Sequence, residues 1–206
     1  MELFWPEAEP DAARNNLNVV IYGLRQTLRE ADASFSHILF QDDCYLFNPQ
    51  LALWLDVEAF NLRVQTAQKL EQQGDRKQAS QEYAAAEMLY QGEFLEEDRY
   101  DEWLNPQRQV LQAAYLSLLE HLSQYYLDQH ETSVAIATCR KMLGVDPSHE
   151  GAHRTLMQCY SAQGQQQLAL RQYHLCTEAL KRELDVSPSA TTTDLDQRIL
   201  AAPIPA

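Results

Sequence analysis

The chain has 206 residues, a length that suits one large domain or two small ones. It carries 16 Lys and Arg against 30 Asp and Glu, a formal net charge of −14, which argues against a protein that coats nucleic acid through a basic surface. Its apolar runs are far shorter than the roughly 18 residues of a membrane span, and its acidic start has no apolar signal segment. With four cysteines in no close pairing, we expect a cytoplasmic protein with reduced thiols and no membrane contact.

The negative charge is unevenly distributed. Residues 1–54 have a net charge of −5, residues 55–130 of −8 and residues 131–206 of −1. The densest acidic run is broken only by Arg99 and consists of Glu93, Glu96, Glu97, Asp98, Asp101 and Glu102. Such a run is more typical of a solvated loop than of an acid–base catalytic site.

The first predicted elements are a helix and a hairpin. Apolar residues recur at steps of three and four over residues 12–30, at Leu17, Val20, Ile21, Leu24 and Leu28. This pattern predicts an amphipathic helix, with Asp11 as the expected N-cap. Two short runs rich in strand-forming residues then flank Asp42-Asp43, which predicts a β-hairpin over residues 37–47.

From Asp56 onward the pattern is helical. Helices are predicted near residues 57–73, 76–90, 107–129, 132–143, 149–163, 166–183 and 191–200. Gly74, His130 and Gly164 stand at short connections between these helices. The predicted fold class is therefore mainly α, preceded by the N-terminal helix and hairpin.

An internal repeat predicts how these helices are arranged. A shift of 34 residues superposes four pairs, namely Leu122 with Leu156, Tyr126 with Tyr160, His130 with Gly164 and Ala135 with Ala169. Thirty-four residues is the period of the tetratricopeptide repeat, a pair of helices joined by a turn. A shift of 56 residues adds an earlier copy, with Gly74 on His130, so about 22 inserted residues separate the first two repeats. The sequence thus predicts a tetratricopeptide-like α–α array.

Four segments of the chain together form a specific combination of motifs. They are Leu55-Asp56-Val57-Glu58-Ala59-Phe60, Tyr90-Gln91-Gly92-Glu93-Phe94-Leu95, Tyr100-Asp101-Glu102-Trp103 with Arg108, and Leu180-Lys181-Arg182-Glu183-Leu184-Asp185-Val186-Ser187-Pro188-Ser189. The combination resembles the bacterial transcriptional activator domain, the tetratricopeptide-like module of regulators of the Streptomyces antibiotic regulatory protein (SARP) type. The likeness covers residues 55–200 and implies an interaction or effector module of a transcription regulator. We expect Trp103 to anchor the inserted segment against the first repeat.

The N-terminal residues also resemble this family. Leu3-Phe4-Trp5-Pro6 and Ala12-Ala13-Arg14-Asn15-Asn16-Leu17 are similar to the second half of the winged helix-turn-helix domain that precedes the module. By this resemblance, residues 12–30 form the recognition helix and residues 37–47 the wing. The first strands and first helix of such a domain are not in the sequence, which leaves open a truncated or a degenerate domain. We therefore assign residues 1–54 to a partial winged helix, 55–200 to the activator domain and 201–206 to a tail.

A recognition helix needs donors that face base edges and cations that face phosphates. The candidate DNA-binding residues are Arg14, Asn15, Asn16, Asn18, Tyr22, Arg25 and Arg29. Asp42 and Asp43 at the wing tip would bring two carboxylates near phosphates, which lowers affinity. The alternative is an amphipathic helix that packs on the hairpin and does not touch DNA.

The first helices of a tetratricopeptide array line its concave groove, which binds peptides or helices. By repeat register, the candidate partner-binding residues are Glu120, Gln124, Asp128, Arg154 and Gln158, with an ordinary solvated surface as the alternative. The partners implied by the resemblance are promoter DNA in the full-length regulator, RNA polymerase or another regulatory domain, and a second copy of the chain. A protein-interaction scaffold or signalling module without DNA binding is the alternative function.

One segment matches a catalytic pattern. His149-Glu150-Gly151-Ala152-His153 fits the H-E-x-x-H motif of zinc metalloproteases, but it starts a repeat helix behind Ser148, the expected N-cap, and no third-ligand motif follows. We expect packing and capping roles for these residues. The cysteines at positions 44, 139, 159 and 176 form no C-x-x-C motif, and nucleophile-elbow, phosphate-loop and dinucleotide motifs are lacking. The sequence therefore predicts no enzyme, no cofactor and no metal.

Overall fold

The computed structural model of the protein describes residues 4–31, 35–98 and 100–202. Its chain divides into two compact units, Met1–Trp54 and Leu55–Ala206, which we describe separately. Arg99 and the expected tail beyond Ala202 lie outside the described residues. Helices dominate the chain and a two-stranded sheet accompanies them, which confirms the predicted fold class.

The first unit consists of one helix and one hairpin. Helix α1 spans Pro10–Ala31, and strands β1 (Ile38–Gln41) and β2 (Cys44–Phe47) pair antiparallel. Because α1 already begins at Pro10, the expected N-cap role of Asp11 is wrong. Proline suits the first position of a helix, where its missing N–H would have had no partner. Asp11 instead lies in the first turn, where the helix dipole favours a negative charge.

The hairpin turns at Asp42 and Asp43, which both have positive φ, 51° and 60°. Positive φ at both central residues is the backbone of the mirror-image turn that matches the twist of paired strands. Aspartate visits this left-handed region more readily than most residues because its short side chain bonds locally. The turn fixes the register in which the rings of Phe40 and Tyr45 meet, with centroids 4.9 Å apart.

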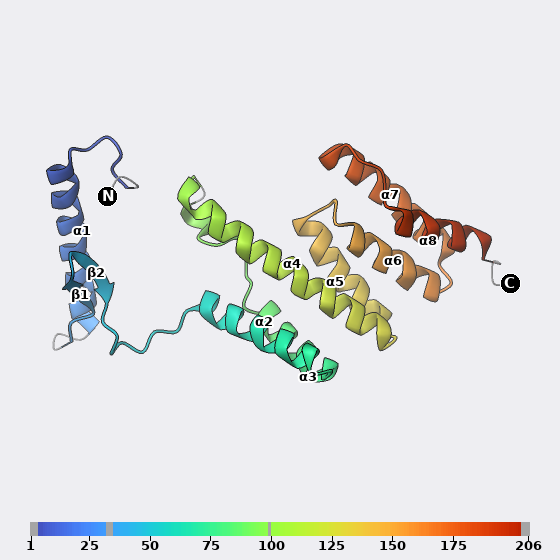
Figure 1. Cartoon of the computed structure of the whole chain (residues 1–206), viewed down its shortest axis with the longest axis horizontal. Coiled ribbons are helices and arrows are strands. Elements are labelled where there is room, and N and C mark those ends of the chain that lie inside the picture. The colour runs from blue at the N-terminus through green and yellow to red at the C-terminus, as the bar shows by residue number, and fades with distance from the viewer. Residues whose placement is uncertain (1–3, 32–34, 99, 203–206) are drawn as a thin grey trace. The chain divides into compact units, whose positions relative to one another are not determined.

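The second unit is an array of helices. They are α2 (Asp56–Gln72), α3 (Arg76–Glu87), α4 (Asn105–Asp128), α5 (Thr132–Val145), α6 (Glu150–Ala162), α7 (Gln166–Leu184) and α8 (Ala190–Ala201). Helices α2 and α3, α4 and α5, and α6 and α7 pack as pairs, and the first helices α4 and α6 also touch (Figure 1). The predicted tetratricopeptide-like array is therefore confirmed.

Small side chains allow the helices to pack closely. Five alanines in the array are completely buried, namely Ala67, Ala86, Ala135, Ala152 and Ala169. Larger side chains such as Leu118, Leu156 and Tyr83 fill the remaining space in one continuous core that runs from α2 to α6. Burial of this apolar surface between neighbouring repeats is the main source of stability in such arrays.

The insertion between α3 and α4 is held by a buried arginine that the sequence did not indicate. It contains two short 3₁₀ turns, Glu96–Asp98 and Glu102–Leu104. The buried guanidinium of Arg108 donates to the backbone carbonyls of Phe94, Leu95 and Asp98 at 2.9–3.0 Å, and Leu104 is buried beside it. Trp103 is 43% exposed, and its anchoring role stays a prediction. Arg108 thus holds the backbone of the segment, while Leu89, Tyr90 and Phe94 pack against the core.

The three short connections take the same backbone conformation. Gly74, His130 and Gly164 have φ of 85°, 60° and 70°, at the equivalent positions that the repeat alignment predicts. Glycine adopts this left-handed conformation freely, whereas a side chain at the same position is strained. His130 therefore carries strain that Gly74 and Gly164 avoid.

Replacement of His130 by glycine should relieve this strain. We expect His130→Gly to raise the free energy of unfolding by about 0.5–1 kcal/mol, because the left-handed penalty exceeds the added entropy of the unfolded chain. Denaturant unfolding followed by circular dichroism measures the change. The matched control Gly164→Ala should lower stability by about 1 kcal/mol. A loss of stability in His130→Gly would show that contacts of the imidazole outweigh the strain.

Candidate functional site

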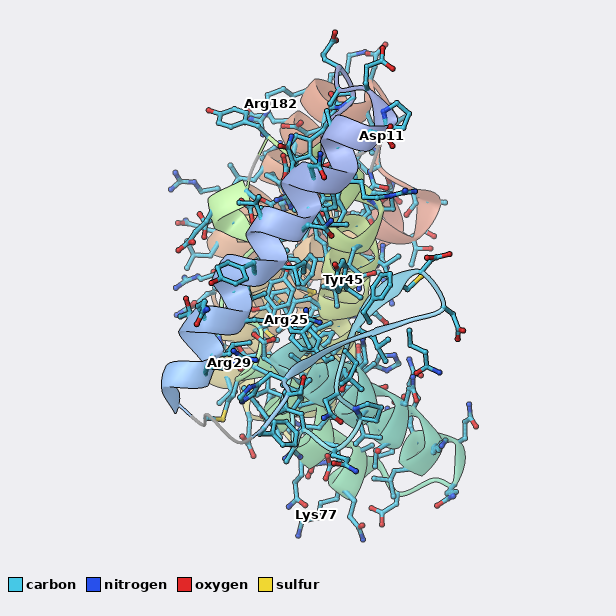
Figure 2. The ribbon with its side chains drawn as sticks, turned by 90° about the vertical axis from the view of Figure 1, so that its left-hand side faces the viewer. Asp11, Arg25, Arg29, Tyr45, Lys77 and Arg182 are labelled. Carbon is cyan, nitrogen blue, oxygen red and sulfur yellow. The ribbon has the colours of Figure 1, made fainter. Side chains whose placement is uncertain are left out.

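The helix and hairpin of the first unit are joined by polar contacts. Arg25 Nη2 donates to the carbonyl of Ile38 at 2.9 Å, and its guanidinium lies 5.5 Å from the ring centroid of Tyr45. The Tyr45 hydroxyl donates to Asn18 Oδ1 at 2.8 Å. Figure 2 shows Arg25 between Asp11 and Arg29 along α1, on the side of the helix that faces Tyr45. These contacts orient the hairpin on one side of α1.

The candidate DNA-binding residues follow one stripe of α1. At 3.6 residues per turn, six of the seven fall within an arc of about 100°, whereas Asn16 lies on the opposite side. The exposed candidates are Arg14, Asn15, Asn16, Asn18, Tyr22 and Arg29. The stripe therefore presents two exposed guanidinium groups and several amide donors to solvent.

Arg25 differs from the other candidates because it is half-buried and bonded to the hairpin. A guanidinium that donates to the Ile38 carbonyl and covers the Tyr45 ring is turned toward the protein. We therefore reassign Arg25 from a DNA contact to a positioning residue. Asn18 has a partly similar role, because its side-chain oxygen accepts from Tyr45, although its amide remains exposed.

The hairpin covers only part of the apolar face of α1. Ala13 is buried, and Leu17, Ile21 and Leu28 are half-buried, but Val20 is 55% exposed. The wing tip is exposed and acidic, with Asp42 and Asp43 at the turn. The first unit thus combines a stripe of donors on its helix with negative charge on its hairpin.

The predicted groove residues of α4 form an exposed row. Glu120, Gln124 and Asp128 follow one another at single-turn spacing, and Gln124 donates to Asp128 at 2.8 Å. Asp128 also accepts from Arg76 Nη1 of α3 at 3.0 Å, which links two repeats. Gln158 of α6 is exposed as well. Since α4 and α6 touch, the structure brings these four side chains onto neighbouring first helices.

Arg154, the fifth predicted groove residue, contacts α8. Its Nη1 donates to the Thr192 hydroxyl at 3.3 Å and lies 3.7 Å from Glu150 Oε1. Glu150 accepts in turn from the Ser189 backbone N–H and from the hydroxyls of Ser189 and Thr192. Burial alone would raise the pKa of Glu150, but these hydrogen bonds and the charge of Arg154 outweigh it and lower the pKa. Arg154 and Glu150 thus fasten the start of α8.

The two histidines of the H-E-x-x-H segment have structural partners. His149 caps α6, because its Nδ1 accepts from the Ala152 N–H at 3.1 Å, so the predicted N-cap role of Ser148 is wrong. His153 is buried, donates from Nε2 to the Pro147 carbonyl at 3.0 Å and accepts at Nδ1 from Gln172 at 2.6 Å. Burial lowers the pKa of His153, which favours this neutral form. Within the described residues, no three His, Cys, Asp or Glu side chains are grouped as a metal site.

The cysteines of the array lie in its core. Cys139, Cys159 and Cys176 are fully buried, whereas Cys44 in the hairpin is exposed. Burial raises the pKa of the Cys139 thiol to about 12 and that of Cys176 to about 11. A thiol that stays protonated is a poor nucleophile. The core cysteines therefore act as small apolar side chains.

Comparison with known proteins decides the family. The sequence profile described as the bacterial transcriptional activator domain matches residues 55–200. The chain belongs to this family. It shares its fold with Mycobacterium tuberculosis EmbR, solved in complex with a low affinity phosphopeptide, with a TM-score of 0.78 and 20% sequence identity. The match covers 97% of this chain and 52% of the EmbR chain, so this chain spans about half the length of EmbR.

The match confirms the bacterial transcriptional activator domain that the sequence motifs predicted over residues 55–200. No curated protein sequence matches the chain. Over the ranges that the structure describes, helices long and apolar enough to cross a membrane are absent. Sequence reasoning missed the anchoring roles of Arg25 and Glu150, since nothing in their local pattern indicates which distant carbonyl or hydroxyl they meet.

Replacement of Arg25 tests whether this residue positions the hairpin on α1. Arg25→Met keeps the length of the side chain but removes the charged hydrogen bond, which contributes about 1–3 kcal/mol. We expect the amides of β1 and β2 to exchange hydrogen faster by NMR, while the repeat array is unchanged. Arg14→Met, on the same helix but exposed, is the matched control. Equal exchange in the two variants would contradict the positioning role.

Replacement of Glu150 tests how the start of α8 is held on α6 within the activator domain. Because the folded-state pKa of Glu150 is lowered, its ionised form stabilises the fold above the ordinary carboxyl pKa, and this contribution is lost as the pH falls through the lowered value. Glu150→Gln should reduce the free energy of unfolding by about 1 kcal/mol at pH 7, and the difference from wild type should shrink below about pH 4. Urea titrations at several pH values measure this. The exposed Glu183→Gln serves as control, and a deficit independent of pH would contradict the assignment.

Proposed function

We propose that this chain is a transcription regulator of the SARP type in which α1 and its hairpin read DNA and the repeat array contacts partner proteins. The observation that carries the DNA-reading part is the stripe on α1 that includes Arg14, Asn15, Tyr22 and Arg29, exposed beside a hairpin fixed by Arg25. Arginine and asparagine donors on one face of a helix suit the major groove, and a hairpin beside the helix suits the neighbouring backbone.

The repeat array is proposed as the interaction module. Exposed polar side chains on α4 and α6, at Glu120, Gln124, Asp128 and Gln158, form a surface of the kind that binds peptides or helices. The proposed partners are RNA polymerase, another regulatory domain or a second copy of the chain. The phosphopeptide in the EmbR structure is in keeping with protein partners for this fold, although it belongs to EmbR.

A scaffold without DNA binding is the second candidate, and charge favours it. The first unit has a net charge of −5, and the exposed Asp42 and Asp43 stand at the wing tip. Since phosphate neutralisation supplies the sequence-independent part of DNA affinity, a negative reader binds weakly and only at low salt. In either case we propose a cytoplasmic protein that acts by binding and without catalysis.

A mobility-shift experiment separates the two candidates. The protein is mixed with a pool of random-sequence duplexes at low salt, and retained duplexes are selected over several rounds. The double variant Arg14→Ala/Arg29→Ala should weaken binding about tenfold or more, because two phosphate or base contacts are lost. Asp42→Asn/Asp43→Gly should strengthen binding several-fold, since it removes two carboxylates and keeps residues that suit the turn.

The matched control for this experiment is Arg171→Ala/Arg198→Ala, which removes the same charge from exposed positions of the repeat array. It should bind DNA like the wild type. Absence of any shifted duplex at low salt would overturn DNA reading and leave the scaffold function. An equal loss in both arginine pairs would mean that binding follows net charge and not the surface of α1.

A further inference from the structure

A pocket lies in the second unit, between the start of α2, the inserted segment and α4. Its volume is about 190 Å³, and its apolar lining includes Val57, Phe60, Phe94, Leu95 and Leu111. Tyr90 forms one wall and is held in place by stacking on Tyr115, with ring centroids 3.9 Å apart. Pockets for drug-sized ligands are larger, roughly 300–1,000 Å³, so this one suits a single side chain.

The rim of this pocket is acidic. Asp56 and Glu93 line the opening, and both are exposed. The inserted segment adds further exposed carboxylates beyond the rim, at Glu96, Glu97, Asp98, Asp101 and Glu102. Arg108 lies 3.9 Å from Glu93, but its guanidinium is buried against three backbone carbonyls and offsets only part of this charge. The pocket thus combines an apolar interior with a negative surround.

We propose that this pocket receives one aliphatic or aromatic side chain of a partner protein segment that carries Lys or Arg on both sides of that side chain. An anchor in a desolvated pocket supplies much of the binding energy of many interfaces, and charges at the rim select the partner and speed association. The inference rests on the proposed interaction role of the repeat array, and it is independent of DNA reading. It adds a second contact surface, on the insertion side of the array, to the row formed by α4 and α6.

The construction of the wall supports this assignment. The backbone carbonyls of residues 94, 95 and 98 are fixed by Arg108, so the inserted segment is pre-organised and its apolar side chains are held in place. A pre-formed site avoids the entropy lost when a loop orders on binding. An acidic partner would meet repulsion from Asp56, Glu93 and the carboxylates that follow.

The test uses the full chain labelled with ¹⁵N and synthetic peptides of about 14 residues, long enough to form some helix. The first peptide contains Ala and Lys with one central Phe. The second has Ala in place of Phe, and the third has Glu in place of Lys. We expect the first peptide to shift the amide signals of Val57, Tyr90 and Leu95, and the second and third to bind about tenfold more weakly or not at all. Added salt should weaken the first peptide, because the rim charges are exposed.

Two variants locate the binding. Val57→Phe fills the pocket, and Asp56→Asn/Glu93→Gln neutralises its rim; each should weaken the first peptide about tenfold. The matched control Glu131→Gln/Asp194→Asn makes the same change of charge, at the N-cap of α5 and on α8, and should leave binding unchanged. Thermal unfolding by circular dichroism confirms that each variant is folded.

The outcomes separate the pocket from the broader function. Binding that survives in both pocket variants and shifts Gln124 and Gln158 instead would overturn the pocket and keep the interaction role of the array. Equal binding of the Lys and Glu peptides, or no binding of any peptide at millimolar concentration, would also overturn it. The mobility-shift result for DNA stands independently of all three.

Discussion

Close approach of neighbouring helices is the constraint on which the second unit depends. It is possible because residues without bulk lie where the helix axes come nearest, with Ala67, Ala135 and Ala169 completely buried. A larger side chain at any of these positions would separate a pair and open the core, since interiors tolerate little extra volume. The spacing of the repeats therefore follows from a few alanines, and the orientation of every exposed side chain follows from that spacing.

The inserted segment between α3 and α4 is held differently from the repeat helices. Leu89, Tyr90 and Phe94 of the inserted segment pack against the continuous core, and Leu104 is buried. A single buried cation, Arg108, satisfies three backbone carbonyls and gives the segment a fixed shape. Packing thus determines the repeats, whereas packing and a polar contact together hold the insertion. The pocket lies between the inserted segment and the helices α2 and α4.

Much of this fold could be predicted from sequence because the repeat signal is local and periodic. The alignment of His130 with Gly164 predicted a shared connection, and the two residues share a left-handed backbone. The mispredicted roles belong to single polar side chains near helix starts or in contact with other elements. Ser148 is a residue type that often caps helices, yet His149 is the N-cap of α6. Pattern identifies which face of a helix is apolar, but it does not identify which polar group finds which partner.

For the candidate interfaces, too, spacing along one helix was predictable from sequence, whereas contacts between elements were not. Sequence register placed Glu120, Gln124 and Asp128 in one row, since spacing along a single helix suffices for that prediction. It did not separate Arg25 from Arg14 and Arg29, because the difference depends on a carbonyl contributed by the hairpin. Arg154 was misjudged for a similar reason, since its surroundings depend on where α8 packs.

The small core beneath α8 has a consequence for how the molecule opens. Met157, Ala169, Leu195 and Ile199 form a cluster of their own, separate from the continuous core of the preceding repeats. Cooperative units of a protein open with free energies set by the apolar surface that each one buries. The last helix therefore packs on α6 and α7 through this small cluster, and we expect it to open at a lower free energy than the continuous core. Its release would return Arg154 and Glu150 to solvent and lengthen the accessible face of α6.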